Sequence, residues 1–224
     1  MSGTRSLGVL GTLLALAACG TPSAKTVDFA KNGKLIGDLP FVTARPGDRA
    51  VFLAPVVDIR PARLAEREGG LPVVYGPDSA WDRPVPEMVG DLLARELAES
   101  QVFQAVLPTA TPDAVVVVPQ LASFHMGTVE NVRGASTLAE FAVNLQVYGP
   151  VGSDGVRPLW FERLYGDRQI TQAQLVPENM FFVASGAVAR SVNKLLVSLD
   201  GTNVGRTGVP LQLGTATEAS AAPR

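Results

Sequence analysis

The segment from residue 138 to residue 148 constrains the fold most, because apolar and polar side chains alternate along it. The apolar positions are Ala139, Phe141, Val143, Leu145 and Val147, and the polar ones are Glu140, Asn144, Gln146 and Tyr148. A period of two predicts a β-strand with one buried face and one solvated face. Such one-sided strands are typical of antiparallel sheets. Residues 149–158 then predict a turn, and residues 159–165 the returning strand of a hairpin.

Two segments have the apolar spacing of helices. Residues 86–100 begin with Pro86 and Glu87, which suit the first turn of a helix and its positive end. Residues 177–199 have the same periodicity, and Gly201 follows as a stop. The stripes are Met88, Val89, Leu92, Leu93 and Leu97 in the first segment, and Phe181, Ala184, Val188, Val192, Leu195 and Leu199 in the second. Each helix therefore has one face to bury.

Three further segments predict strands, namely residues 51–57, 102–107 and 114–125. Pro55 lies inside the first, where it cannot donate a ladder hydrogen bond, so we expect one side of that strand to be irregular. Two one-sided helices can cover one face of a single sheet. The sequence therefore predicts an α+β fold, with a single mixed, mostly antiparallel sheet of about five strands and both helices on one face.

The N-terminus has the pattern of an export signal. Arg5 supplies a short positive region, and an apolar run from Leu7 to Ala18 follows, too short for a permanent membrane-spanning helix. The run ends in Leu16-Ala17-Ala18-Cys19, which resembles the lipobox of bacterial lipoproteins, where cleavage precedes the cysteine. The resemblance implies acylation of Cys19, palmitate included, and two or three acyl chains hold a protein stably on a membrane. Gly20 after the cysteine resembles the outer-membrane sorting choice of enteric bacteria. An ordinary signal peptide followed by a stray cysteine is the alternative.

These features divide the chain into four parts. Residues 1–18 are the predicted signal peptide, and residues 19–47 are a lipid anchor with a polar, flexible tether. Residues 48–200 are the predicted α+β domain in the periplasm. Residues 201–224 are rich in Gly, Thr, Ala and Pro and predict a disordered tail.

Composition narrows the function. The formal net charge is −2 and no run of basic residues occurs, so nucleic acid is not an expected partner. The chain has one cysteine and one histidine, His125, which excludes a disulfide, a His-rich zinc site and a Cys–His catalytic pair. No dinucleotide motif, phosphate-binding glycine loop or Gly-x-Ser-x-Gly motif occurs. The sequence therefore predicts no cofactor, no metal and no catalytic residue.

Asp58, Arg60, Tyr75 and Trp81 are the candidates for contact with a protein partner. Asp58 and Arg60 follow the first predicted strand and can form either an ion pair at its end or one wall of a groove. Tyr75 and Trp81 lie in a proline-rich loop, which can present aromatic surface at low entropic cost. Packing of Trp81 against the first helix is the alternative.

Paired carboxylates leave one enzymatic alternative. Glu87 and Asp91 share a face of the first predicted helix, and glycan hydrolysis needs two carboxylates. This spacing, followed by Arg95, is more typical of a solvated helix face. We therefore expect no enzyme, and a carboxylate-dependent hydrolase of cell-wall glycan is the least favoured option.

The plan of the chain resembles two groups of small bacterial envelope lipoproteins. After the lipobox come a strand ending in Val57-Asp58-Ile59-Arg60-Pro61, then Trp81, Pro84 and the helix from Glu87 to Glu99. One group is the auxiliary lipoproteins of ABC-type and Mce-type lipid transporters, and the other is the YajG-like lipoproteins. The tyrosine-containing segment common after the acylated cysteine in the first group has no convincing counterpart here. The resemblance covers residues 50–200.

What this resemblance implies is a place in the envelope and no catalytic residue. We expect a non-catalytic auxiliary component of an envelope transport or assembly complex. It would be lipid-anchored to the periplasmic face of the outer membrane and would bind an envelope protein. A freestanding lipid- or small-ligand-binding lipoprotein is the alternative.

Overall fold

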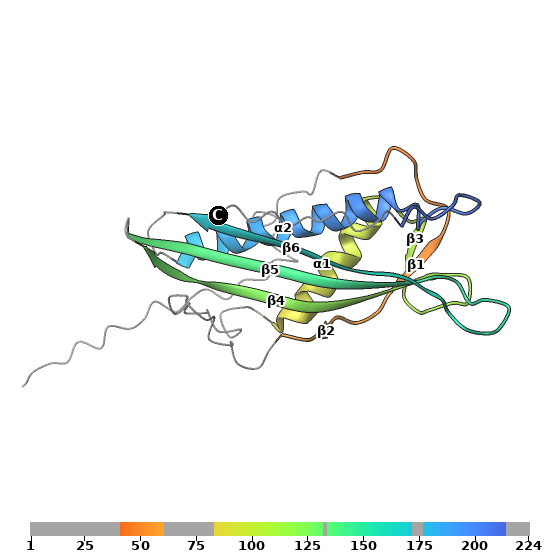
Figure 1. Cartoon of the computed structure of the whole chain (residues 1–224), viewed down its shortest axis with the longest axis horizontal. Helices are drawn as coiled ribbons and strands as arrows, with labels where there is room; N and C mark the ends of the chain where they lie inside the picture. The colour runs from red at the N-terminus through yellow and green to blue at the C-terminus, as the bar shows by residue number, and fades with distance from the viewer. Residues whose placement is uncertain (1–40, 61–82, 132–133, 172–176, 214–224) are drawn as a thin grey trace, which may run out of the picture.

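The computed structural model describes residues 41–60, 83–131, 134–171 and 177–213 (Figure 1). The elements are β1 (Ala50–Leu53), β2 (Val57–Asp58), α1 (Val85–Glu99), β3 (Ala105–Leu107), β4 (Val115–Asn131), β5 (Gly134–Tyr148), β6 (Leu159–Thr171) and α2 (Pro177–Gly201). Strands form one mixed sheet and the two helices pack on it, so the predicted α+β class is confirmed.

The sheet is built from a parallel part and an antiparallel part. Its six strands have the order β3-β1-β4-β5-β6, and β2 pairs with β4 beside this path. β1 is parallel to both β3 and β4, because the connection through α1 is long enough for a crossover. β4, β5 and β6 follow one another as antiparallel hairpins. The predicted hairpin of residues 138–148 with residues 159–165 is confirmed.

Pro55 divides the first predicted strand into two. β1 pairs with β4 through Val51 and Val115, and β2 pairs with the same strand through Val57 and Gln120. The register therefore changes by one residue across the proline, which has no N–H to donate to the ladder. The expected irregularity is present, and it interrupts the strand between β1 and β2.

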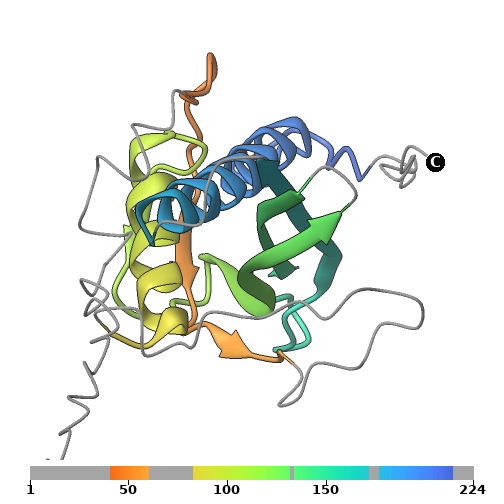
Figure 2. The same cartoon turned by 90° about the vertical axis from the view of Figure 1, so that its left-hand side faces the viewer.

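Both helices pack against the same face of the sheet and bury their stripes there, as far as the described side chains from residue 182 onward show for α2 (Figure 2). On β5 the five apolar positions of the alternating pattern are at most 1% exposed, as are all five stripe residues of α1. Ser191 of α2 donates a hydrogen bond to the carbonyl of Phe141, which lies at the centre of this core. The window Phe182–Gly201 of α2 is apolar and long enough to cross a membrane by composition, but 56% of it is buried inside the domain. The buried part of this window belongs to the core of the domain.

The opposite face of the sheet is polar at its centre, as the alternation predicts. Asn144 donates hydrogen bonds to Gln120 on β4, over 2.9 Å, and to Glu162 on β6. Gln146 donates to Glu162 over 3.3 Å and accepts from the hydroxyl of Tyr148. These cross-strand bonds fix the register of three neighbouring strands on the solvated side.

The strand predicted at residues 102–107 is shorter in the structure. Only Ala105–Leu107 is a strand, because Gln101 has a φ of 57° and turns the chain out of α1. The consecutive residues Val102 and Phe103 are both buried, at 2% and 3% exposure, which an alternating strand does not allow. They form a packed corner between α1 and β3.

The folded domain is longer at both ends than the predicted range 48–200. Before it, Thr43 is buried and its N–H donates to the carbonyl of Ser100. Beyond α2, Val204 is fully buried, and the carbonyl of Gly205 accepts from the N–H groups of Asp48 and Arg49. The described residues 202–213 are therefore packed, and the prediction of disorder from Gly201 onward is wrong for them.

Candidate functional site

Asp58 and Arg60 form a closed ion pair where β2 ends. The guanidinium of Arg60 donates to both carboxylate oxygens of Asp58, from Nε over 2.9 Å and from Nη2 over 2.7 Å. The backbone N–H of Arg60 adds a third hydrogen bond over 3.1 Å. These hydrogen bonds from Arg60 hold the pKa of the Asp58 carboxyl below its ordinary value. The pair therefore has the geometry of the ion pair at the strand end that was one of the two expectations.

The other predicted site residues lie outside the described residues. These are the lipidation candidate Cys19 and the aromatic residues Tyr75 and Trp81. The predicted partner surface that combines the two aromatic residues with Asp58 and Arg60 therefore stays a prediction.

A groove lies between α1 and the parallel strands. Its volume is about 700 Å³. The lining residues are Phe52, Leu53, Ala54, Pro55, Val56, Arg83, Pro86, Glu87, Gly90, Asp91, Ala94, Val106, Leu107 and Pro108. It lies where β1 and β3 end, and ligands of open α/β sheets bind at the carboxyl ends of parallel strands.

Small residues on α1 form one wall of the groove. Pro86, Gly90 and Ala94 follow one another at intervals of one helical turn, so they lie on one face. A Cβ at position 90 would lie 3.4 Å from Cγ2 of Val56, so the glycine allows the chain after β1 to approach the helix. Gly in a helix interior destabilises the helix by about 1 kcal/mol relative to Ala. At position 90 this loss is accompanied by the close approach of Val56 to the helix.

The floor of the groove is apolar and its rim carries charge. The side chains of Phe52, Leu53 and Leu107 line it as half-buried apolar groups. Glu87 and Asp91 lie on its α1 side, and Asp91 forms an ion pair with Arg83 at 2.6 Å. Such a groove can hold the apolar part of a ligand or of a peptide, with charged groups at its margin to orient it. The two carboxylates of the enzymatic alternative thus face this groove.

Sequence reasoning did not identify the groove. The feature of the sequence that could have indicated the groove is the spacing of Pro86, Gly90 and Ala94 along an otherwise amphipathic helix. That spacing becomes a groove only because β1 and β3 end opposite it. Within the described ranges, no group of three or more His, Cys, Asp or Glu side chains converges as a set of metal ligands.

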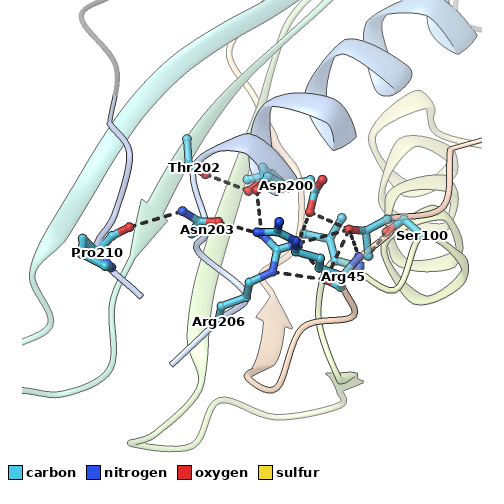
Figure 3. A network of polar contacts seen from close by, with 10 residues as sticks. Arg45, Ser100, Asp200, Thr202, Asn203, Arg206 and Pro210 are labelled. Carbon is cyan, nitrogen blue, oxygen red and sulfur yellow. Dashed lines mark hydrogen bonds and ion pairs between the residues drawn. The ribbon is translucent and has the colours of Figure 1, made fainter. Parts of the chain in front are cut away.

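A polar network joins the two ends of the domain (Figure 3). The guanidinium of Arg206 donates to the carbonyl of Arg45 over 2.7 Å and to Oδ1 of Asn203 over 2.7 Å, and it forms an ion pair with Asp200. Thr43 donates to the same aspartate over 2.7 Å. Charge-assisted hydrogen bonds of this kind are among the stronger polar contacts. The network secures the segment through which the chain enters the domain to the end of α2.

No protein-family model matches this sequence, and a search of curated proteins finds no match. Solved structures with a similar arrangement include a Xanthomonas campestris protein assigned to the family DUF330, at 13% identity and a TM-score of 0.48. The similarity covers 73% of this chain and 90% of that chain. A minor lipoprotein from Acinetobacter baumannii has 10% identity and a TM-score of 0.40, over 70% and 93% of the two chains. Lipoprotein GNA1162 from Neisseria meningitidis has 10% identity and a TM-score of 0.33, over 67% and 93%. At these values the likeness carries no argument about activity, and the resemblance to transporter auxiliary and YajG-like lipoproteins stays a prediction.

Proposed function

We propose that this chain is a lipid-anchored protein of a bacterial envelope that acts, without catalysis, as an auxiliary component of a transport or assembly complex. The observation that carries the proposal is Leu16-Ala17-Ala18-Cys19 at the end of an apolar export segment. The described domain starts at residue 41, so residues 20–40 separate it from the acylated cysteine. An extended chain of this length reaches at most roughly 70 Å, which lets the domain meet a partner some distance from the membrane.

Metabolic labelling with palmitate tests the anchor. The wild-type protein should incorporate label and fractionate with outer membranes, whereas Cys19→Ser should be unlabelled and released by lysis. The double variant Cys19→Ser/Ser23→Cys is the matched control, because it keeps a cysteine but moves it out of the lipobox. It should stay unlabelled. Equal membrane retention of wild type and Cys19→Ser would refute the anchor.

The auxiliary role rests on the surfaces that the described domain offers. The groove next to α1 is apolar with a charged rim, and interfaces combine an apolar centre with a polar border in the same way. Affinity purification of the lipidated protein from gently solubilised membranes should therefore recover a defined envelope protein. Gly90→Leu, which fills the groove, should lose that partner. Ala98→Leu is the control, because Ala98 is exposed on the same helix and does not line the groove.

A freestanding ligand-binding role is the second candidate, and the volume of the groove favours it. About 700 Å³ lies within the range of small-molecule sites. Organic extraction of purified protein followed by mass spectrometry should then detect a lipid retained by wild type and by Ala98→Leu, but not by Gly90→Leu. Recovery of a protein partner without a retained lipid would favour the auxiliary role instead.

A further inference from the structure

Strand β6 leaves a long edge of the sheet unpaired in the described part of the chain. Leu159–Thr171 pairs only with β5 there, and Figure 2 shows it at the end of the curved sheet opposite α1. The edge strand on the other side, β3, has only 3 residues. An edge of 13 residues presents a row of backbone donors and acceptors, which is a template for pairing with another strand.

Helix α2 lies above β6 rather than beyond it. The hydroxyl of Tyr165 donates to Oγ of Ser198 over 2.8 Å, and Arg163 donates to the same atom over 2.9 Å. Lys194 donates to the carbonyl of Gly166 over 3.0 Å, so it occupies one backbone acceptor of the strand. These contacts from α2 reach side chains on one face of β6, and pairing of a further strand at Gly166 requires the Lys194 side chain to move off that carbonyl.

We infer that β6 pairs antiparallel with β6 of a second copy of this chain, with the twofold axis at Tyr165. In this register Glu162 lies opposite Arg168 of the other copy, and Arg163 lies opposite Asp167. Glu162 is on the solvated face of the sheet, where it accepts from Asn144 and Gln146. Arg163 and Asp167 are on the face covered by α2, where they contact Ser198 and Lys194. Opposite charges thus meet on both faces of the joined sheet, and directly opposed charges of unlike sign stabilise a strand pair.

The charges also specify the register. A shift of the axis by one residue in either direction moves all four charged residues away from an opposite charge. A shift by two residues places Arg163 opposite Arg163, or Asp167 opposite Asp167, and like charges directly opposed are destabilising. The register centred on Tyr165 therefore has both the attraction and the selectivity that a self-pairing strand needs.

Apolar contacts accompany the charges next to the axis. Leu164 is 61% exposed, and in this register it lies opposite Gly166 of the second copy. A Cβ at Gly166 would lie 3.1 Å from Cβ of Ala142, which is a tight contact, so a small residue also suits the monomer here. The pairing would cover Leu164 with the backbone of the neighbouring copy.

Engineered disulfides test this pairing in the full-length protein purified in detergent. Glu162→Cys/Arg168→Cys should form a dimer linked by disulfides under mild oxidation, because opposed Cα atoms in antiparallel strands lie within disulfide range. Each single variant should stay uncrosslinked, since its new cysteine is then far from its own copy across the axis. Wild type contains one cysteine, Cys19, and serves as the background control. Absence of the crosslink in the double variant would overturn the inference.

A charge exchange tests the register without cysteines. Arg168→Glu places two like-charged pairs across the axis and should raise the dimer dissociation constant roughly tenfold or more in sedimentation equilibrium. Glu162→Arg/Arg168→Glu restores opposite charges and should return the constant to near that of wild type. Circular dichroism confirms that each variant is folded. A wild type that is monomeric at micromolar concentration, or a double variant that does not recover, would also overturn it.

Discussion

Substitution of Gly205 by alanine is the sharpest test of how the C-terminal segment packs. A Cβ at position 205 would lie 1.8 Å from the carbonyl oxygen of Val102 and 2.9 Å from its carbonyl carbon. Both atoms are backbone, so no side-chain rotation relieves the clash, and the segment has to move. Movement would break the hydrogen bonds from Asp48 and Arg49 to the Gly205 carbonyl, now 2.9 and 3.0 Å long. Overpacking costs about 1–3 kcal/mol and each backbone hydrogen bond contributes about 1 kcal/mol. We therefore expect a loss of about 3 kcal/mol and a fall in Tm of about 10 °C.

Thermal unfolding of the mature protein, followed by circular dichroism, measures this effect. Gly201→Ala is the matched control, because a Cβ at that position has no other atom within 4 Å and the residue belongs to the last turn of α2. This control should raise stability by about 0.5 kcal/mol through the reduced freedom of the unfolded chain. If Gly205→Ala melts within about 1 °C of wild type, which is under about 0.5 kcal/mol for a domain of this size, residues 202–213 do not pack on Val102 and the reasoning is refuted.

Two further predictions concern the core and the strand-end ion pair. Phe141 is 1% exposed and contacts Phe124 edge to face, so Phe141→Ala should cost about 3–5 kcal/mol in urea unfolding, whereas Val156→Ala, at a position 60% exposed, should change stability by less than about 0.5 kcal/mol. Equal losses would contradict the assigned core. Because Arg60 lowers the pKa of Asp58 below 3.8, the stability from this pair is present above pH 3.8 and is lost as the pH falls through the lowered pKa. Asp58→Asn should therefore lower the free energy of unfolding by less than about 1 kcal/mol at pH 7, and this difference should shrink as the pH falls below 3.8. A difference that widens in acid would disprove the pairing.

Local patterns predicted the parts of the fold that depend on neighbours in sequence. The period of two gave β5, and the helical stripe gave α1 within one residue at each end, since burial of one face follows directly from spacing. The turn at Gln101 was missed because its positive φ is set by the packing of the two residues after it, which are both buried. A run of apolar residues cannot distinguish such a corner from a strand.

Long-range contacts explain the remaining differences. The segment after α2 contains one fully buried side chain, Val204, and its composition is that of a tail. Its order depends on contacts such as that of Arg206 with Thr43, which lie 163 positions apart in the sequence. The groove also depends on long-range contacts, because the small residues of α1 line a groove only where the ends of β1 and β3 lie opposite them. The pairing of Asp58 with Arg60 was predictable because the two residues are two positions apart.

If the chain is anchored at Cys19 as proposed, the network around Arg206 has a mechanical consequence. Any pull from the membrane reaches the domain at Phe41 and passes first to Thr43, Arg45 and the backbone bonds of Gly47. Arg206 connects this segment to the end of α2, whose other contacts run along β5 and β6. The load is therefore shared between α2 and the strands beneath it before it can peel β1 from the sheet. The proposed anchor would thus pull on the domain where Arg206 holds its entry segment to the end of α2.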